Sequence, residues 1–230
     1  MTTKDRTWHP RGPSADAQIR ALLDGTKTQL RLPMRPQPIH RVVEGLAHVT
    51  IGMDPAADGA IWYDADGKSP GRELRSPFGR IGDMLSVRER HWFRESDGIT
   101  AFADGSLTPH PTSMIGAKNI KPDKPPEDDW PNNATQYGFK CKAATQMPAW
   151  ASRLTLLVLD VLAERLQDIS EADAQAEGVD SVSMADVRRN ATLSRRQDFA
   201  QLWDATWLKA GFGWDANPWV WVANVEKVTK

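Results

Sequence analysis

The side chains best suited to chemistry lie in the stretch GTKTQLRLPMRP, residues 25–36. This stretch and the residues just before it contain four cationic side chains: Arg20, Lys27, Arg31 and Arg35. A lysine partly withdrawn from water can act as a base or hold a phosphate, and a guanidinium group can bind a phosphate or a base edge. The pattern therefore predicts that Lys27 and Arg31 bind a nucleic acid or nucleotide, with Gln29 reading a base edge.

The spacing of Lys27 and Arg31 favours phosphates over a small carboxylate ligand. Along an extended strand the two residues are about 13 Å apart, which suits successive phosphates of one chain. The alternatives are ordinary surface roles: a solvated lysine, an amide with no ligand at Gln29, and a salt bridge made by Arg31.

The charge balance limits the size of any such ligand. The chain has 29 Lys and Arg residues against 30 Asp and Glu, a net charge of −1. Proteins that wrap a long duplex usually carry a broad basic excess. We therefore expect local contact with a few nucleotides, one base or a nucleoside.

Hydrophobic alternation predicts the element that carries these residues. Thr28, Leu30, Leu32 and Met34 share one face of a strand over 27–34, and the polar residues at 27, 29 and 31 share the other. This indicates a half-buried strand whose cationic face is exposed at the rim of a cleft.

The surrounding pattern predicts an α+β fold, a small mixed β-barrel with helices packed on it. A helix over about 15–24 would be capped by Ser14 and ended by Gly25. Further strands are expected at 47–52, 60–63, 84–89, 154–162 and 217–228, a turn at 77–83, and helices at about 168–178 and 195–209. In the last helix Phe199, Leu202, Trp203 and Trp207 form the apolar stripe, and Ser194 with Gln197 forms a capping box.

Two segments are expected to stay outside the packed fold. Residues 1–13 are interpreted as a flexible arm, and residues 14–230 as a single domain. Within it, a Pro-rich insertion at about 96–146 has at its centre a flap, 104–136, whose composition predicts a long loop.

Four blocks of the sequence together resemble the ASCH domain family in its phage and prophage form. These blocks are LLDGTKTQLRLPM, SPFGRIGDMLSVRE, MPAWASRLTLLVLDVLAERLQDISEADAQAEG and LWDATW…GWDANPWVWV. Within the family motif, the matching residues are Gly25, Lys27, Thr28, Gln29 and Arg31. The resemblance implies a PUA-like barrel and a cleft that binds RNA or a modified nucleoside.

The resemblance also implies catalytic candidates. One family type hydrolyses the acyl amide of N4-acetylcytidine with a lysine, a threonine three residues later and a glutamate; these positions hold Lys27, Leu30 and Glu177 here. Leucine has no hydroxyl and cannot be a nucleophile, which weakens the hypothesis that the chain is an amidohydrolase. Ser152 is the nearest replacement hydroxyl to propose. A ribonuclease is the other enzymatic alternative.

Further binding candidates come from blocks that border the family pocket. Glu89 and Trp92 are assigned to the pocket, with barrel packing and an ion pair as the alternative. Trp150 could stack on a base or belong to the core, and Arg153 follows it as a cation. The C-terminal tryptophans, Trp214, Trp219 and Trp221, are expected to be core residues.

Other classes of function are set aside by what the sequence lacks. The histidines do not have the paired spacing of a metal site, Cys141 is the only cysteine, and no cofactor motif occurs. No apolar run is long enough for a membrane span, so a cytoplasmic protein is expected, inside the host cell if phage-encoded. A third functional alternative is a phage morphogenesis or host-interaction protein that uses the flap to contact a protein partner.

Overall fold

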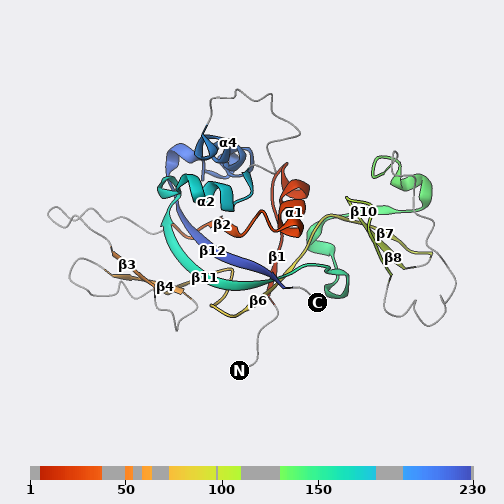
Figure 1. Ribbon diagram of the computed structural model, residues 1–230, viewed down its shortest axis with the longest axis horizontal. Coiled ribbons are helices and arrows are strands. Elements are labelled where there is room, and N and C mark those ends of the chain that lie inside the picture. Colours follow the sequence, from red (N-terminus) through yellow and green to blue (C-terminus); the bar gives the residue numbers. More distant parts are fainter. Residues whose placement is uncertain are drawn as a thin grey trace.

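The computed structural model describes residues 6–37, 50–53, 59–63, 73–96, 98–109, 130–179 and 194–228. Figure 1 shows an α+β architecture in which two long curved strands, β11 and β12, cross the middle of the molecule. The helices α2 and α4 lie together on one side of them. The predicted α+β class is confirmed.

The central sheet has five strands in the order β1–β6–β11–β12–β2. Their bounds are Arg6–Trp8 for β1, Met84–Val87 for β6, Thr155–Arg165 for β11, Trp219–Val228 for β12 and Gln29–Pro33 for β2. The strands β1 and β6 are parallel, and every other pair is antiparallel. The sheet thus contains strands from both ends of the described chain: β1 and β2 from the N-terminal part and β12 from the C-terminal end.

Two smaller sheets flank the central one. The first has the order β10–β7–β8–β9, with bounds Lys140–Lys142, His91–Arg94, Ile99–Phe102 and Leu107–Pro109. The second has the order β3–β4–β5, with bounds Thr50–Met53, Gly59–Tyr63 and Glu73–Arg75. All three sheets are open over the described residues, so the expected closed barrel is not seen in that part of the chain.

Three α-helices accompany the sheets in the described ranges: α1 (Ala15–Asp24), α2 (Glu171–Ala176) and α4 (Arg195–Trp207). Short 3-10 turns are η3 (Ala134–Tyr137), η4 (Ala144–Gln146), η5 (Ala149–Ala151), η6 (Leu166–Asp168), η7 (Leu208–Ala210) and η8 (Trp214–Ala216). Capping boxes begin α2 and α4, made by Ser170 with Asp173 and by Ser194 with Gln197.

The predicted helix boundaries are mostly confirmed. Gly25 ends α1 with φ 77°, a left-handed conformation that glycine adopts without strain. At the other end of α1, Ser14 is the N-cap residue as predicted, but its side chain makes no capping hydrogen bond. Its hydroxyl oxygen instead accepts a hydrogen bond from Gln18 Nε2 at 3.1 Å.

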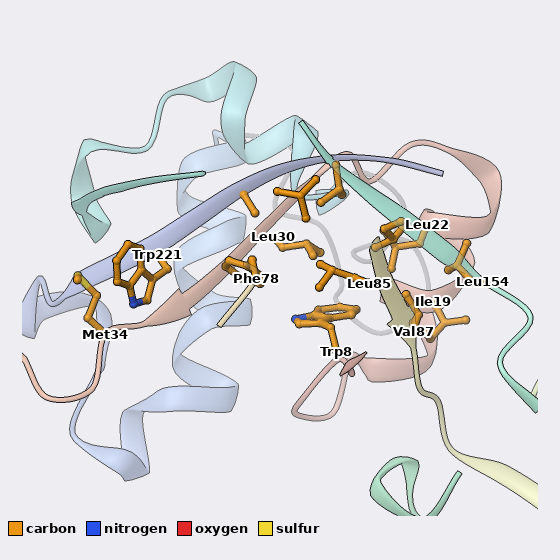
Figure 2. Packing of buried hydrophobic residues seen from close by; sticks show 14 residues of the cluster. Trp8, Ile19, Leu22, Leu30, Met34, Phe78, Leu85, Val87, Leu154 and Trp221 are labelled. Atoms are coloured by element: carbon orange, nitrogen blue, oxygen red, sulfur yellow. The ribbon is translucent and has the colours of Figure 1, made fainter. Parts of the chain in front are cut away.

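Hydrophobic side chains fill both faces of the central sheet. Figure 2 shows the cluster on the face of α1, which includes Trp8, Ile19, Leu22, Leu30, Met34, Phe78, Leu85, Val87, Leu154 and Trp221. A second cluster lies under α2 and α4 and includes Leu166, Ile169, Ala174, Val179, Phe199, Trp203, Trp207, Val220 and Val222. Strand β12 contributes alternate residues to the two clusters, as the two-residue period of a strand requires. Helices therefore cover the sheet on both sides.

Several strand predictions are corrected in their extent. The flexible arm at 1–13 is wrong for residues 6–8, because they form β1 and Trp8 is buried in the core. The strand expected at 84–89 ends at Val87. The strands predicted at 60–63, 154–162 and 217–228 correspond to β4, β11 and β12. Of the strand predicted at 47–52, residues 47–49 lie outside the described residues.

The insertion predicted at 96–146 is not simply a loop. Its described parts supply β8, β9, β10 and η3, which share a small core with Trp92, Ile99, Ala101, Ala134 and Phe139. These short strands were not predicted because the Pro-rich composition of the insertion favours a loop. The central part of the insertion, 110–129, lies outside the described residues. Aromatic side chains at the two ends of the insertion provide enough apolar surface for local packing.

Candidate functional site

The backbone brings the start of β2 against the end of α2. The Thr28 N–H donates to the Ala176 carbonyl at 2.8 Å, and the Thr28 carbonyl accepts from Val225 N–H at 2.8 Å. The helix α2 is thereby attached to the edge of the central sheet. This connection places Glu177, the residue that follows α2, beside Lys27.

Gly178 makes this close approach possible. Its φ is +80°, and a Cβ atom placed there would lie 3.0 Å from Lys27 Cβ and 3.2 Å from Ala21 Cβ. Only glycine combines the left-handed conformation with so little space. The sequence around Glu177 is therefore adapted to hold its carboxylate over β2.

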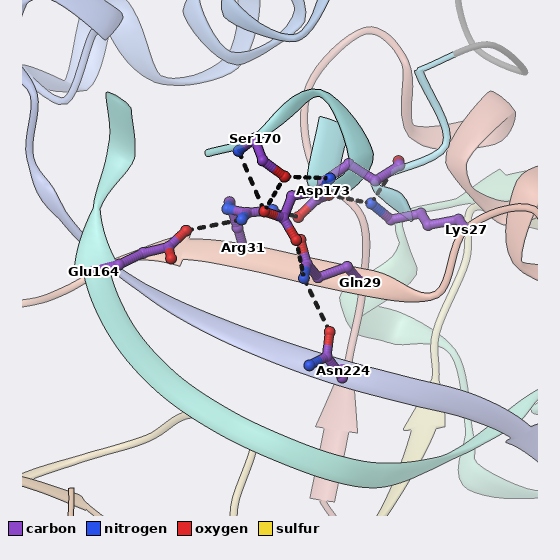
Figure 3. Close-up of polar contacts among 8 residues, drawn as sticks. Lys27, Gln29, Arg31, Glu164, Ser170, Asp173 and Asn224 are labelled. Carbon is purple, nitrogen blue, oxygen red and sulfur yellow. Dashed lines mark hydrogen bonds and ion pairs between the residues drawn. The ribbon is translucent and has the colours of Figure 1, made fainter. Parts of the chain in front are cut away.

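Glu177 accepts hydrogen bonds from both predicted cations. Lys27 Nζ donates to the Glu177 carboxylate, to Oε2, and to the Glu177 carbonyl at 2.9 Å. Arg31 Nη1 donates to Glu177 Oε1 at 3.1 Å, and Arg31 Nη2 donates to Glu164 Oε1 at 2.8 Å. Figure 3 shows these contacts between β2, β11 and the helical segment above them. The two positive charges are thus compensated by two carboxylates.

Gln29 lies between the two cations and links them to α2 and β12. Its Nε2 donates to Asp173 Oδ1 at 3.1 Å and to Asn224 Oδ1 at 2.9 Å, while its Oε1 accepts from Arg31 Nη1 (Figure 3). All polar atoms of the Gln29 amide are therefore occupied within the protein. Burial alone would raise the pKa of Asp173, but hydrogen bonds from Ser170 and Gln29 outweigh it and lower the pKa.

A cavity of about 60 Å³ adjoins the ion pairs. Polar groups of Lys27, Arg31 and Glu177 lie on one side, and α4 and the N-terminal segment provide the other walls. The lining residues are Trp8, His9, Arg11, Ser14, Gln18, Lys27, Arg31, Leu32, Glu177, Phe199, Leu202, Trp203, Thr206 and Trp207. The cavity combines aromatic walls with a charged, hydrogen-bonding side.

Two residues that line this cavity each have a buried donor atom without a hydrogen-bond partner in the described part of the chain: Arg31 Nε and Trp8 Nε1. The ammonium group of Lys27 has three N–H bonds, and the acceptors found for it are the two Glu177 oxygens. An unsatisfied buried donor costs about 1–3 kcal/mol. An acceptor atom that came within hydrogen-bond distance of these donors would remove that cost.

His9 adds a titratable group to the cavity. Burial lowers the pKa of His9, and the charges of Arg11 and Arg88 lower it further. The imidazole is therefore neutral at neutral pH. A neutral imidazole has one donor and one acceptor nitrogen, so His9 can both donate and accept a hydrogen bond in the cavity.

The predicted exposure of the site is wrong. Lys27, Gln29 and Arg31 share one strand face as predicted, but they are only 4%, 5% and 6% exposed. The reason is that α2 and α4 cover this face, which local alternation cannot reveal. Leu30 points to the opposite face and is fully buried in the core, so its position supplies nothing to the cavity.

Glu89 and Arg153 form a second ion-pair cluster. Arg153 Nε and Nη2 donate to the two Glu89 carboxylate oxygens, each at 2.8 Å, and Nη1 donates to Asp104 Oδ2 and Ser106 Oγ, each at 2.6 Å. The Arg153 guanidinium lies 4.2 Å from the centre of the Phe102 ring. These residues lie before β11, between β6 and β7, and in the β8–β9 turn, so the cluster connects two sheets.

The pKa values of the two carboxyl groups that share Arg153 are shifted in opposite directions. Burial raises the pKa of Glu89, and the hydrogen bonds from Arg153 only partly oppose that shift. Burial would also raise the pKa of Asp104, but hydrogen bonds from Arg153 and Ser106 prevail and lower it. The cavity beside this cluster is about 20 Å³ and is lined by Asp16, Ile19, Arg20, Glu89, Ala103, Asp104 and Arg153.

The remaining predicted residues do not line the cavity at Lys27. Trp92 is buried among the side chains of the four-stranded sheet and packs edge-on against Trp130. Trp150 packs against Phe102, Met147 and Ala151. Ser152 is buried, with its hydroxyl 2.9 Å from the Val87 carbonyl and 3.1 Å from the Leu154 carbonyl, as suits a structural hydrogen bond. Of the C-terminal tryptophans expected in the core, Trp221 is buried, whereas Trp214 and Trp219 are partly buried.

Sequence reasoning missed part of the site. Glu164, Asp173 and Asn224 complete the network around Arg31 and Gln29. A charged or amide side chain inside an otherwise apolar strand is a signal that could have pointed to Glu164 and Asn224. Trp203 and Trp207 had been assigned only to the apolar stripe of α4.

A wider hollow of about 450 Å³ lies near the start of β2, away from the aromatic walls. Its described lining residues are Leu22, Gly25, Lys27, Thr28, Leu156, Leu159, Asn224, Val225, Glu226 and Lys227. None of these is aromatic. This hollow therefore has less to offer a planar ligand than the cavity under α4.

The described ranges contain no group of three or more His, Cys, Asp or Glu side chains arranged to hold a metal ion. Over the same ranges, no helix has the length and apolar character needed to cross a bilayer.

Comparison with known proteins provides no independent assignment for this site: no family model, no curated protein and no solved structure matches the chain.

Proposed function

We propose that this chain binds RNA or a nucleotide, in the manner of ASCH-domain proteins, by taking the edge of one base into the cavity beside Lys27 and Glu177. One observation carries the proposal. Aromatic rings of Phe199, Trp203 and Trp207 line the same cavity as the ion-paired polar groups of β2 and α2.

The cavity walls suit a planar base. Stacking of a base on an aromatic side chain contributes about 1–3 kcal/mol and is available to every base. The volume of about 60 Å³ has room for a few water molecules, so a base edge would enter and the sugar and phosphate would stay outside.

The polar side of the cavity suits hydrogen bonds to a base edge. Arg31 Nε, Trp8 Nε1 and the third N–H of Lys27 are donors with no partner among the described residues. Carbonyl oxygens and ring nitrogens of a base are acceptors that could satisfy them. The ion pairs also argue against phosphate at Lys27 and Arg31, because Glu177 and Glu164 already compensate those charges.

Blocking the cavity tests this proposal. The ligands are the four common ribonucleosides, N4-acetylcytidine and a five-nucleotide RNA of mixed sequence, measured by calorimetry and by quenching of tryptophan fluorescence. Leu202→Trp fills the cavity from α4 and should weaken binding at least tenfold. The matched control is Leu208→Trp at a side chain that is 60% exposed and lies outside the cavity.

Equal affinity of the two tryptophan variants and the natural chain would contradict the proposal. Charge reversal at Lys27 and Arg31 is a poorer test, because both side chains are buried and paired. Loss of binding in such a variant could simply reflect unfolding.

A hydrolase is the second candidate, favoured by the direct contact between Lys27 and Glu177. The Glu177 carboxylate could take a proton from water as the water attacks the acyl carbon, and the Lys27 ammonium could stabilise the negative oxygen that forms. When the acyl C–N bond breaks, Glu177 would return that proton to the leaving N4 nitrogen. The products from N4-acetylcytidine would be acetate and cytidine. With Leu30 in the core, water is a more reasonable nucleophile than a side chain of β2.

Chromatography of N4-acetylcytidine and of mixed single-stranded RNA after incubation without metal tests the hydrolase candidate. Product that disappears in Lys27→Met, while that variant keeps its folded circular dichroism spectrum, would support it. The absence of product at high enzyme concentration would leave binding as the function to retain.

A further inference from the structure

Two exposed cations close to the cavity can still attract a phosphate. Lys27 and Arg31 are compensated by Glu177 and Glu164. By contrast, Arg11 and Arg35 are exposed, and neither has a carboxylate partner in the described part of the chain. The uncompensated positive charge near the site therefore includes these two arginines.

Arg11 and Arg35 meet at one aromatic ring. The Arg11 guanidinium carbon lies 5.4 Å from the centre of the Trp207 ring, and that of Arg35 lies 5.6 Å from the same centre. Arg35 also lies 4.8 Å from the centre of the Phe212 ring. Trp207 and Arg11 both line the cavity, and Arg35 is linked to it through its contact with the Trp207 ring.

The aromatic contacts prepare these guanidinium groups to bind an anion. Contact with a ring face restrains the side chain without using the N–H groups along the guanidinium edge. A restrained guanidinium loses less conformational freedom when it forms paired hydrogen bonds with a phosphate.

We propose that Arg11 and Arg35 form a phosphate subsite for the nucleotide whose base enters the cavity. This inference rests on the proposed function and specifies its ligand as a phosphorylated nucleotide or an RNA chain, not a free nucleoside. The base is recognised inside, by aromatic walls and buried donors, and the phosphate is held outside, by exposed arginines. The reason for this division is that Glu177 and Glu164 compensate the cations inside, whereas Arg11 and Arg35 have no carboxylate partner among the described residues.

A comparison of ligands with and without phosphate tests the subsite. The probes are the four common ribonucleosides and N4-acetylcytidine, their 5′-monophosphates, and a five-nucleotide RNA of mixed sequence. The proteins are the natural chain, the double variant Arg11→Ala/Arg35→Ala and the control Arg20→Ala/Lys140→Ala. The control removes two exposed cations from elsewhere, so net charge is matched.

For the natural chain, we expect phosphate to improve affinity by about 10–100-fold, the range for one or two charge-assisted hydrogen bonds. In Arg11→Ala/Arg35→Ala this advantage should disappear, while the affinity for the nucleoside stays within about threefold. The control should keep the advantage. The salt dependence of RNA binding should also weaken in the double variant only.

The outcomes separate the subsite from the proposed function. Nucleoside binding with no gain from phosphate, in the monophosphates or in RNA, would overturn the subsite and leave the base cavity supported. A phosphate advantage that persists in Arg11→Ala/Arg35→Ala would also overturn it. No binding of any probe to the natural chain would overturn both.

The source of the phosphate is distinguished by the same data. An advantage for monophosphates indicates that the phosphate of the bound nucleotide itself is held. An advantage seen only with RNA, and lost in the double variant, indicates that the neighbouring nucleotide supplies the phosphate. Both results support the subsite.

Discussion

Arg31 and Arg153 each bridge two carboxylates, but their surroundings differ. Arg31 bonds Glu177 and Glu164 beneath α2 and beside a cavity with aromatic walls. Arg153 bonds Glu89 and Asp104 at the junction of two sheets, where its side chain is 18% exposed. The first cluster adjoins a cavity of about 60 Å³, whereas the second joins parts of the fold and adjoins a cavity of only about 20 Å³. Ion pairing alone therefore does not identify a functional site, and the adjoining space is the more informative feature.

The largest expected difference between the clusters concerns their central carboxylates. Glu177→Gln should lower the free energy of unfolding by about 3–5 kcal/mol, because two buried cations lose their shared negative partner. Glu89→Gln should cost less than about 1 kcal/mol, because the burial that raises the pKa of Glu89 already opposes its charged form. Urea denaturation measures both.

A second substitution distinguishes lost pairing from lost packing. In Lys27→Met/Glu177→Gln, one buried charge of each sign is removed, so part of the stability should return. A loss below about 1 kcal/mol in Glu177→Gln alone would contradict the importance of the first cluster.

The next effect concerns the backbone that positions the first cluster. Gly178→Ala should lower the free energy of unfolding by about 2–3 kcal/mol, since a left-handed alanine is strained and its Cβ would press on Lys27. Gly211→Ala has a similar φ of +81° but open space around the added Cβ, so a cost of about 1 kcal/mol is expected. Thermal unfolding compares the two. Equal losses would mean that the approach of α2 to β2 is not tight.

A smaller effect should appear in the pH dependence of the second cluster. Because burial raises the pKa of Glu89, the folded state binds its proton more tightly than the unfolded state does. The contribution of Glu89 to the free energy of unfolding should therefore increase as pH falls through the folded-state pKa. Denaturation of the natural chain and of Glu89→Gln across the acidic range measures this contribution as a difference. A difference that moves in the opposite direction would contradict it.

The smallest effect should appear at the edge of the first cluster. The pKa of Asp173 is lowered, so its carboxylate contributes stability above its unfolded-state pKa and loses it as pH falls through the folded-state value. In Asp173→Asn, the free energy of unfolding should therefore decrease less as the pH falls through this acidic range. We expect only a slight change, because Asp173 is partly exposed. If the pH dependence of the free energy of unfolding is the same in the variant and the natural chain, other groups cause the loss of stability at acidic pH.

Elements defined by short-range signals were predicted well. Gly25 marks the end of α1, Ser194 and Gln197 mark the start of α4, and the apolar run at 154–162 overlaps β11. The contact between Lys27 and Glu177 follows the positions that the family resemblance implied. Trp92, Trp150 and Ser152 were placed at the site by sequence proximity to family blocks, but neighbouring packing draws them elsewhere.

The cationic stretch shows where local reasoning ends. Its four cations separate into three environments: Lys27 and Arg31 lie under α2, Arg35 lies over Trp207, and Arg20 lines the small cavity beside Arg153. Their closeness in the sequence predicts a basic surface. Carboxylates from distant segments remove that property for the inner pair.

The sharing of one strand face by Lys27, Gln29 and Arg31 needs nothing beyond the order of residues, because side chains alternate along any extended chain. Whether that face meets water depends on long-range packing. Two helices that follow more than a hundred residues later cover it, and its charge is compensated by Glu164 from β11 and by Glu177, which follows α2. Burial and charge pairing are properties of several segments together, so neither can be inferred from the segment alone.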